Sequence, residues 1–249
     1  NKIIYFQIEN TYWLPNNSWF RTDVLPKIKH NYTYEKNYMH PVITPNFINK
    51  TYDELKNLKY PDKKKNISAI VSSKKCARSY RKRRYFIINY SNKYPNSIDI
   101  FGRNWKKNLL GSNYKGGLGS YHQELNRKTS KYDGLINYNY SICLENFPKD
   151  KGKISEKITD CILCWTIPIY SGSKETIQYF PKDSFYLIDV LDKRHISKTK
   201  EISEKKVTNE NIKALEKARN LILDKYNIWE HIYQIINNLD DYLINYKFQ

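Results

Sequence analysis

The chain has 249 residues, 40% of them hydrophobic, which is enough for a core of ordinary size in one large domain or two smaller ones. No uninterrupted apolar run is long enough for a membrane-spanning helix, and four cysteines are too few for a disulfide framework in a chain of this length. The first residue is Asn rather than Met, so we expect the chain to be a piece of a longer protein.

The formal net charge of +18 suggests a polyanionic partner at first sight. However, Lys, Asn, Ile and Tyr are all abundant, which is typical of a compositional bias in the encoding genome and raises the charge without selection for nucleic-acid binding. Position is more informative, because residues 63–84 contain ten basic side chains and no acidic one. The sequence therefore predicts a local anion site there and does not favour a nucleic-acid partner.

The first part of the chain has few regular patterns. Residues 2–8 are typical of a buried strand, and Glu9 follows where this strand opens into a loop at 10–18. Residues 32–47 suggest short strands and turns, and a polar stretch that closes near residue 62 marks a boundary. We therefore assign residues 1–66 to an N-terminal domain.

From residue 68 onwards, strand patterns alternate with helix patterns. Such alternation predicts a parallel sheet with helices on both of its faces. Residues 103–130 are rich in Gly and have no clear period, so we expect a long mobile loop there. The predicted strands are 68–73, 98–102, 140–144, 166–170 and 184–189, and the predicted helices are 79–93, 132–137, 154–165 and 174–180.

The last part of the chain is polar and then helical. Residues 192–206 are highly charged, which favours an exposed loop, whereas 209–224 and 228–246 carry the apolar stripes of two amphipathic helices. We therefore predict a second domain at 67–207, which would bind a nucleotide, followed by helices at 208–249 that pack on the domains.

Three polar residues stand at the junction between the predicted strand 140–144 and the helix that follows it. Lys157 falls in the first helical turn, where the helix dipole disfavours a cation unless an anion is bound, so it is a candidate phosphate ligand. Glu156 could accept hydrogen bonds from sugar or ribose hydroxyls, although Ser155-Glu156 is also ordinary helix-capping chemistry. Asn146 ends the strand and could position a donor or a phosphate, or could simply be a turn residue.

Other familiar sites are missing from the sequence. No Asp-x-Asp triplet closes a strand, the five His residues are scattered, and neither a Walker loop nor a Gly-x-Ser-x-Gly elbow occurs, so we expect no metal site. Cys161 and Cys164 have the spacing of a redox or metal pair. They lie in an apolar helical pattern without a second pair nearby, and we interpret them as buried packing residues.

The segment from residue 68 to 189 resembles the donor-sugar half of the family 10 glycosyltransferases, the α-1,3/1,4-fucosyltransferases and their bacterial and viral relatives. The resemblance is carried by three motifs in the family's order and nearly in its spacing. They are Leu144-Glu145-Asn146, Ser155-Glu156-Lys157 and Ile167-Pro168-Ile169-Tyr170-Ser171-Gly172.

The resemblance implies a GT-B fold, in which two Rossmann-like domains face each other across a cleft, here with an abridged N-terminal domain. It also implies an inverting, metal-independent transfer of fucose or a related deoxyhexose from GDP-fucose to an oligosaccharide hydroxyl. An Arg of the basic cluster would bind the donor pyrophosphate, and we favour Arg83, followed by Arg81 and Arg78. Glu9 would be the catalytic base, with Asp23 and Glu35 as alternatives.

The chain departs from the family pattern at two places, since the loop between Asn146 and Glu156 is slightly longer and Lys153 replaces a common aromatic residue. We therefore expect altered donor contacts. Two other hypotheses remain open, a basic RNA-binding module whose tyrosines stack bases, and an inactive glycosyltransferase domain that only binds glycans or partners. A cytoplasmic setting is favoured over the Golgi lumen.

Overall fold

A computed structural model of the chain describes residues 4–6, 30–32, 47–118, 130–146 and 154–237. The first two of these segments are the strands β1 (Ile4–Phe6) and β2 (His30–Tyr32), which pair in parallel. The predicted strand 2–8 therefore contains a described strand. The loop at 10–18 and the predicted catalytic Glu9 lie outside the described residues.

The main body is built on a six-stranded sheet in which every neighbouring pair is parallel. Its spatial order is β5-β4-β3-β6-β7-β8, so the chain first proceeds to one edge, returns to the centre, and then proceeds to the other edge. This is the strand order of a Rossmann sheet, and the predicted α/β class is confirmed. The strands are β3 (Lys65–Ile70), β4 (Asp99–Phe101), β5 (Tyr114–Gly116), β6 (Tyr138–Leu144), β7 (Ile167–Ser171) and β8 (Tyr186–Leu187).

The central strands form because they are short, continuous apolar runs that can be covered on both faces. All five residues of β7 are buried, and so are six of the seven residues of β6. Where a polar side chain enters this layer it finds a partner, because Ser68 of β3 and Ser141 of β6 hydrogen-bond across the strands at 3.2 Å.

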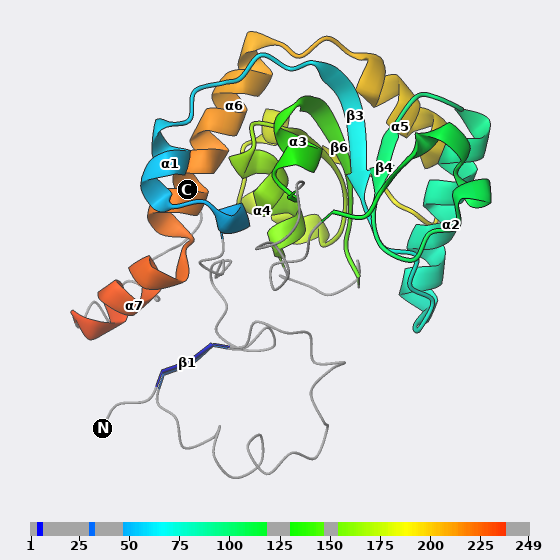
Figure 1. Ribbon diagram of the computed structural model, residues 1–249. Coiled ribbons are helices and arrows are strands. Elements are labelled where there is room, and N and C mark those ends of the chain that lie inside the picture. Colours follow the sequence, from blue (N-terminus) through cyan, green and yellow to red (C-terminus); the bar gives the residue numbers. More distant parts are fainter. Residues whose placement is uncertain (1–3, 7–29, 33–46, 119–129, 147–153, 238–249) are drawn as a thin grey trace, which may run out of the picture.

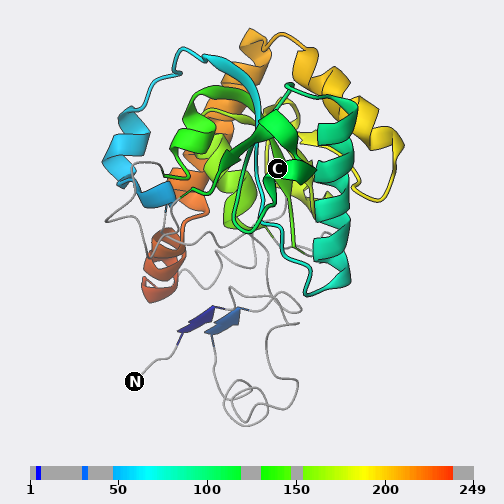
Figure 2. The same ribbon diagram turned by 45° about the vertical axis from the view of Figure 1, so that its right-hand side comes forward.

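Helices cover both faces of the sheet (Figures 1 and 2). On one face α2 packs with α5, which also contacts β3. On the other face α4 packs on β6 and β7 and is itself covered by α6. The bounds are α1 (Tyr52–Asn57), α2 (Arg78–Lys93), α3 (Asp133–Ile136), α4 (Glu156–Leu163), α5 (Arg194–Glu204), α6 (Asn209–Asn220) and α7 (Ile228–Ile236).

The segment before β3 is tied to α4 and α6 by a buried arginine. The guanidinium of Arg219 donates to the carbonyls of Leu163 and Leu55 and lies 4.5 Å from the ring centroid of Trp165. The indole of Trp165 in turn donates to the carbonyl of Leu58 at 2.9 Å. Backbone carbonyls and an aromatic face thus replace a carboxylate as partners of this cation.

Several sequence expectations differ from the structure. The predicted loop 103–130 contains the edge strand β5, and the predicted loop 192–206 forms α5, whose buried Ile196, Thr199, Ile202 and Ser203 are spaced for one helix face. Residues 174–178 form a short 3-10 helix instead of an α-helix, and the helix predicted at 209–224 changes to π geometry at residues 221–225. The helix predicted at 228–246 is described as far as residue 236.

No helix in the described ranges combines the length and the apolar character needed to cross a membrane.

Lys63 supplies a pH-dependent term to the stability of this fold. Its ammonium donates to the carbonyls of Ile136 (2.8 Å) and Cys164 (2.9 Å), and it has no carboxylate partner in the described segments. Burial lowers the pKa of Lys63 to about 7. The unfolded chain, with an ordinary lysine pKa of about 10.4, therefore binds more protons than the folded chain between pH 7 and 10.

We accordingly predict that the free energy of unfolding rises with pH above 7, and that Lys63→Met reduces this slope by at most about 1.4 kcal/mol per pH unit. Urea unfolding at intervals from pH 7 to 8.5 measures the difference. The exposed neighbour provides the control, since Lys64→Met should leave the slope unchanged. Equal slopes for Lys63→Met and the unmutated chain would contradict the prediction.

Candidate functional site

The order of the strands places a switch point between β3 and β6, where the chain leaves the centre of the sheet in opposite directions. In sheets of this kind, ligands bind beyond the carboxyl ends of the two strands that flank such a point. Here the end of β3 leads into α2, which packs on one face, and the end of β6 leads into α4, which packs on the other. Side chains of both helices therefore meet beyond the carboxyl ends of β3 and β6.

Glu145, directly after β6, is held by several contacts at the carboxyl end of the strands. It is only 4% exposed, and its backbone N–H continues the ladder by donating to the carbonyl of Ser171 at 2.9 Å. Its carboxylate accepts hydrogen bonds from the hydroxyls of Ser155 at 2.6 Å and Tyr170 at 3.2 Å, and it lies 3.4 Å from the ammonium of Lys157. The buried carboxylate of Glu145 thus has three hydrogen-bond donors as partners.

Lys157 lies in the first turn of α4, as the sequence predicts. Ser155 is the N-cap, and its hydroxyl accepts from the backbone N–H of Lys157 at 3.2 Å. Burial lowers the pKa of Lys157, but the charges of Glu145 and Glu156 outweigh this effect and hold the pKa above its ordinary value. The ammonium is therefore a permanent cation at a helix N-terminus, held there by carboxylates.

Arg83 reaches the same strand end from α2. Its guanidinium is 5% exposed and donates from Nη1 to the side-chain oxygen of Asn146, and it lies 5.2 Å from the ring centroid of Tyr80. Burial lowers the pKa of Arg83, and the nearby charges of Tyr80 and Glu145 partly offset this shift. Its Nε has no acceptor within the described residues. The buried guanidinium of Arg83 thus has one donor that pairs with no described protein group.

A second ion pair involves Asp160, which lies one helical turn after Glu156 in α4. Lys131 contacts the carboxylate of Asp160, which is 5% exposed. Burial raises the pKa of Asp160 above its ordinary value, and Lys131 counteracts that rise. Lys131 and Lys157 together also hold the pKa of Glu156 below its usual range, against the opposing effect of burial. Glu156 itself is half-exposed and ionised at neutral pH.

Directly after the carboxyl ends of β3 and β4, the backbone makes a tight contact. Gly102 has φ +153°, and a Cβ at this position would lie 1.9 Å from the carbonyl oxygen of Val71. The indole of Trp105 donates to that same oxygen at 2.7 Å. Arg84 lies over the Trp105 ring and donates to the hydroxyl of Ser73 at 3.1 Å. Arg84 is thus engaged by Trp105 and Ser73.

The predicted site residues fall into two groups. Arg83 and Lys157 contact consecutive residues at the end of β6, namely Asn146 and Glu145, and Glu156 adjoins Lys157. The other two predicted arginines, Arg78 and Arg81, lie elsewhere, in a hollow of about 510 Å³ between α2 and the start of α5. The predicted base Glu9 and its alternatives Asp23 and Glu35 lie outside the described residues.

Sequence reasoning did not identify the parts played by Lys131 and Asp160, and it named Glu145 only as a member of a motif. A signal was present for both acids. Glu145 directly follows an apolar strand, and Asp160 interrupts the apolar run of α4, so each carboxylate is buried and must have a partner. The identity of those partners depends on contacts that are distant in the sequence.

Metal-binding and thiol chemistry find no support in the described residues. Within those ranges, no group of three or more His, Cys, Asp or Glu side chains is gathered as a metal would require. Cys143, Cys161 and Cys164 are buried free thiols, and burial holds the pKa of Cys143 and Cys164 well above its ordinary value. The interpretation of Cys161 and Cys164 as packing residues agrees with this burial.

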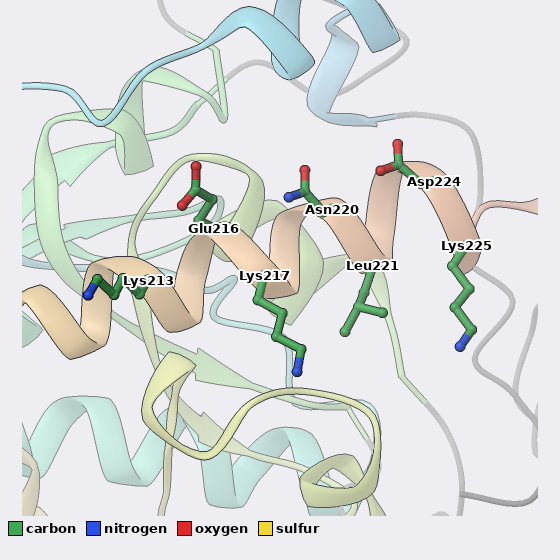
Figure 3. Close-up of a pocket in the computed structure, with 7 residues that line it drawn as sticks. All are labelled: Lys213, Glu216, Lys217, Asn220, Leu221, Asp224 and Lys225. Carbon is green, nitrogen blue, oxygen red and sulfur yellow. The ribbon is translucent and has the colours of Figure 1, made fainter. Parts of the chain in front are cut away.

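A second hollow, of about 380 Å³, follows α6 and the π turn after it (Figure 3). Lysines and acids alternate along it, and the acid nearest to α1 is already occupied. The carboxylate of Asp224 accepts from the hydroxyl of Tyr52 at 2.8 Å and from the ammonium of Lys56 at 2.6 Å. Three lysines and two acids line this hollow, and Asp224 already pairs with Lys56 of α1, so we assign no ligand to it. Its lining residues are Lys213, Glu216, Lys217, Asn220, Leu221, Asp224 and Lys225.

No family model and no curated protein matches the chain. Solved structures do give matches. A crystal structure of an α1,3-fucosyltransferase with GDP is 20% identical, covers 86% of this chain and 49% of its own, and has a TM-score of 0.36. TarM has 16% identity over 73% of this chain and 36% of its own, with a TM-score of 0.45.

The N-terminal domain of trehalose-6-phosphate phosphatase from Candida albicans has 10% identity over 81% of this chain and 48% of its own, with a TM-score of 0.48. The present chain thus spans about half the length of the fucosyltransferase that it matches.

Glu145 and Glu156 form a matched pair for testing how the site is held, because they lie at 3.4 and 3.3 Å from the same ammonium but are buried and half-exposed, respectively. We predict that Glu145→Ala lowers the free energy of unfolding by about 3 kcal/mol, since it leaves a partly buried cation and two hydroxyls without their acceptor.

The matched change Glu156→Ala should cost less than about 1 kcal/mol, because its carboxylate is largely solvated. Urea denaturation at pH 7 compares the two variants. Similar losses for both, or a loss below about 1 kcal/mol for Glu145→Ala, would show that Glu145 does not hold the site together.

Proposed function

We propose that the chain is a glycosyltransferase, which moves a sugar from a nucleoside diphosphate to a hydroxyl of an oligosaccharide acceptor. The observation that supports this best is the convergence of Arg83 and Lys157 on consecutive residues at the switch point of a Rossmann sheet. Two cations from two crossover helices, at the position where such sheets bind nucleotides, match the needs of a pyrophosphate.

The chemistry of sugar transfer explains why two cations are useful. When the bond between the anomeric carbon and the pyrophosphate breaks, negative charge develops on the leaving oxygen, and fixed positive charge nearby stabilises it. The ammonium of Lys157 would bind one phosphate, while the planar guanidinium of Arg83 would bind another through two donors. With both in place, the leaving group needs no metal ion.

Side chains of the protein hold the cations of Arg83 and Lys157 in position. Glu145 holds Lys157, and the side-chain oxygen of Asn146 accepts from Arg83. The amide nitrogen of Asn146 then remains as a donor for a phosphate or sugar oxygen. The ionised and half-exposed Glu156 can accept hydrogen bonds from two hydroxyls, which suits a ribose or the transferred sugar.

The identity of the donor and the reaction stereochemistry follow from the family resemblance rather than from contacts. We propose GDP-fucose, or the GDP derivative of a related deoxyhexose, as donor, and an inverting displacement in which Glu9 removes the proton of the acceptor hydroxyl. Residues 1–66 would supply the acceptor side of a GT-B cleft, 67–207 the donor side, and 208–249 the helices that pack on both.

The first test is a thermal-shift panel with GDP, UDP and dTDP and their sugar conjugates. We predict that GDP and GDP-fucose raise the melting temperature in proportion to the logarithm of ligand concentration, because they bind only the folded chain. UDP and dTDP should have smaller effects. No shift with any of the nucleotides would contradict the proposal, whereas a tight response to RNA without a response to GDP would favour a nucleic-acid module.

The second test concerns the role of Lys157. Since Lys157→Ala alone would leave the buried Glu145 without its cation, the informative variant is Lys157→Met combined with Glu145→Gln, which removes both charges and keeps the apolar stem. We predict at least a tenfold weaker affinity for GDP in isothermal titration, with an unchanged circular dichroism spectrum.

Glu145→Gln alone is the control and should retain most of the GDP affinity, because the amide oxygen still accepts from Ser155 or Tyr170. Equal GDP affinity in the double variant and the unmutated chain would refute the role of Lys157.

A further inference from the structure

The basic cluster of α2 has a second face, which the proposed donor site does not use. Arg78, Arg81, Lys82 and Tyr85 are spaced at i, i+3, i+4 and i+7 and therefore lie on one side of the helix, whereas Arg83 lies off this side and is buried. The exposed side faces the segment that joins β8 to α5. Between them lies the hollow of about 510 Å³, and we call it the α2/α5 hollow.

The floor of the α2/α5 hollow is apolar, and its walls carry only positive charge. Phe86, Val190 and Ile196 are buried, and the side chains of Tyr85 (54%) and Leu191 (43%) are exposed at its margin. Four cations complete the lining as far as it is described, and no acidic residue is among the described lining residues. These cations are Arg78, Arg81, Lys82 and Lys193.

The cations of the α2/α5 hollow have almost no protein partners. Within the described residues, the side chains of Arg78, Lys82 and Lys193 have no hydrogen bond or ion pair, and the side chain of Arg81 has only a long contact of 3.5 Å to the backbone carbonyl of Lys75. Other cations at the surface, such as Lys56 and the partly buried Lys200, do form ion pairs. The four cations of the α2/α5 hollow therefore have no acidic partner among the described residues.

The acids closest in sequence to the α2/α5 hollow are already occupied. The carboxylate of Asp192 accepts from the guanidinium of Arg194 at 2.7 Å and from its backbone N–H at 2.9 Å. The carboxylate of Asp189 accepts from the backbone N–H of Leu191 at 2.8 Å. Neither acid pairs with a cation of the hollow, so the cations remain available to a ligand.

The hydrogen-bonding inventory of the hollow restricts its ligand. Arg and Lys side chains only donate, so a neutral sugar, whose hydroxyls must also donate, would find few acceptors. Phosphate and sulfate groups only accept and match arginine pairs. The apolar floor and the exposed Tyr85 ring provide a surface for a flat or apolar body, and the volume is that of a small-molecule site.

We propose that the α2/α5 hollow is a second anion site, which binds a phosphate or sulfate ester of an apolar or aromatic body, separately from the nucleotide site at Arg83 and Lys157. The tetrahedral oxyanion would contact Arg78, Arg81 and Lys193, and the body would lie against Tyr85 and the apolar floor. This inference goes beyond the proposed function and does not require it.

The test uses 1-naphthyl phosphate and 1-naphthyl sulfate as probes, titrated into the full chain by calorimetry. At least one ester should bind, more weakly as salt rises, and at least tenfold more tightly than 1-naphthol or inorganic phosphate, because each of those lacks half of the contacts. The comparison of the two esters identifies the preferred oxyanion. Equal binding of inorganic phosphate and the ester would overturn the role of the apolar floor.

Matched variants test whether the ester binds in the α2/α5 hollow. Arg78→Gln with Arg81→Gln should weaken ester binding at least tenfold and leave GDP affinity unchanged, whereas Lys106→Gln with Lys107→Gln, which removes two exposed lysines elsewhere, should change neither. Tyr85→Ala should weaken ester binding about fivefold or more, as the loss of a stacking surface does. Ester binding that is unchanged in Arg78→Gln with Arg81→Gln would overturn the site.

Two further arms separate the alternatives. Saturating GDP should leave ester binding unchanged, and displacement of the ester by GDP would show that the two sites are one. Phosphatidylserine vesicles are the other arm. Vesicle binding that depends on Arg78 and Arg81, in the absence of soluble-ester binding, would show that the hollow binds a membrane surface and would overturn a small-molecule site.

Discussion

The carboxylate of Glu145 determines where the site can form. It is buried directly after β6, so protein groups must supply its hydrogen-bond donors in place of water. Ser155, Tyr170 and Lys157 are these donors. As a result, the first turn of α4 is fixed against the end of β6. The next residue, Asn146, holds Arg83 from the opposite crossover. A single strand end thus positions both cations of the site.

Helix α2 explains how one basic segment can serve more than one purpose. Arg83 points toward the sheet and is buried, Arg84 lies against Trp105, and Arg78 and Arg81 line the α2/α5 hollow. The high net charge of the chain is therefore divided among distinct environments on the faces of one helix. A charge total or a run of basic residues cannot reveal this division, because the phase of the helix decides which side chains are buried.

Much of this arrangement follows from the sequence, and the remainder has identifiable causes. The apolar runs predict β6 and β7, and the Ser155 cap predicts the start of α4 and hence the place of Lys157. The three-residue strand β5 has too few residues to show a period, and the many charges of α5 obscure its buried stripe. The partners of Glu145 and Asp160 are set by tertiary contacts, and the role of Glu9 stays a prediction.

The most direct measurement is a crystal structure of the chain, or of its longer parent protein, with GDP bound. We predict phosphate oxygens within hydrogen-bond distance, about 2.7–3.2 Å, of both the Arg83 guanidinium and the Lys157 ammonium, beyond the end of β6. A diphosphate bound in the α2/α5 hollow, or at any place where it contacts neither of these two cations, would contradict the account.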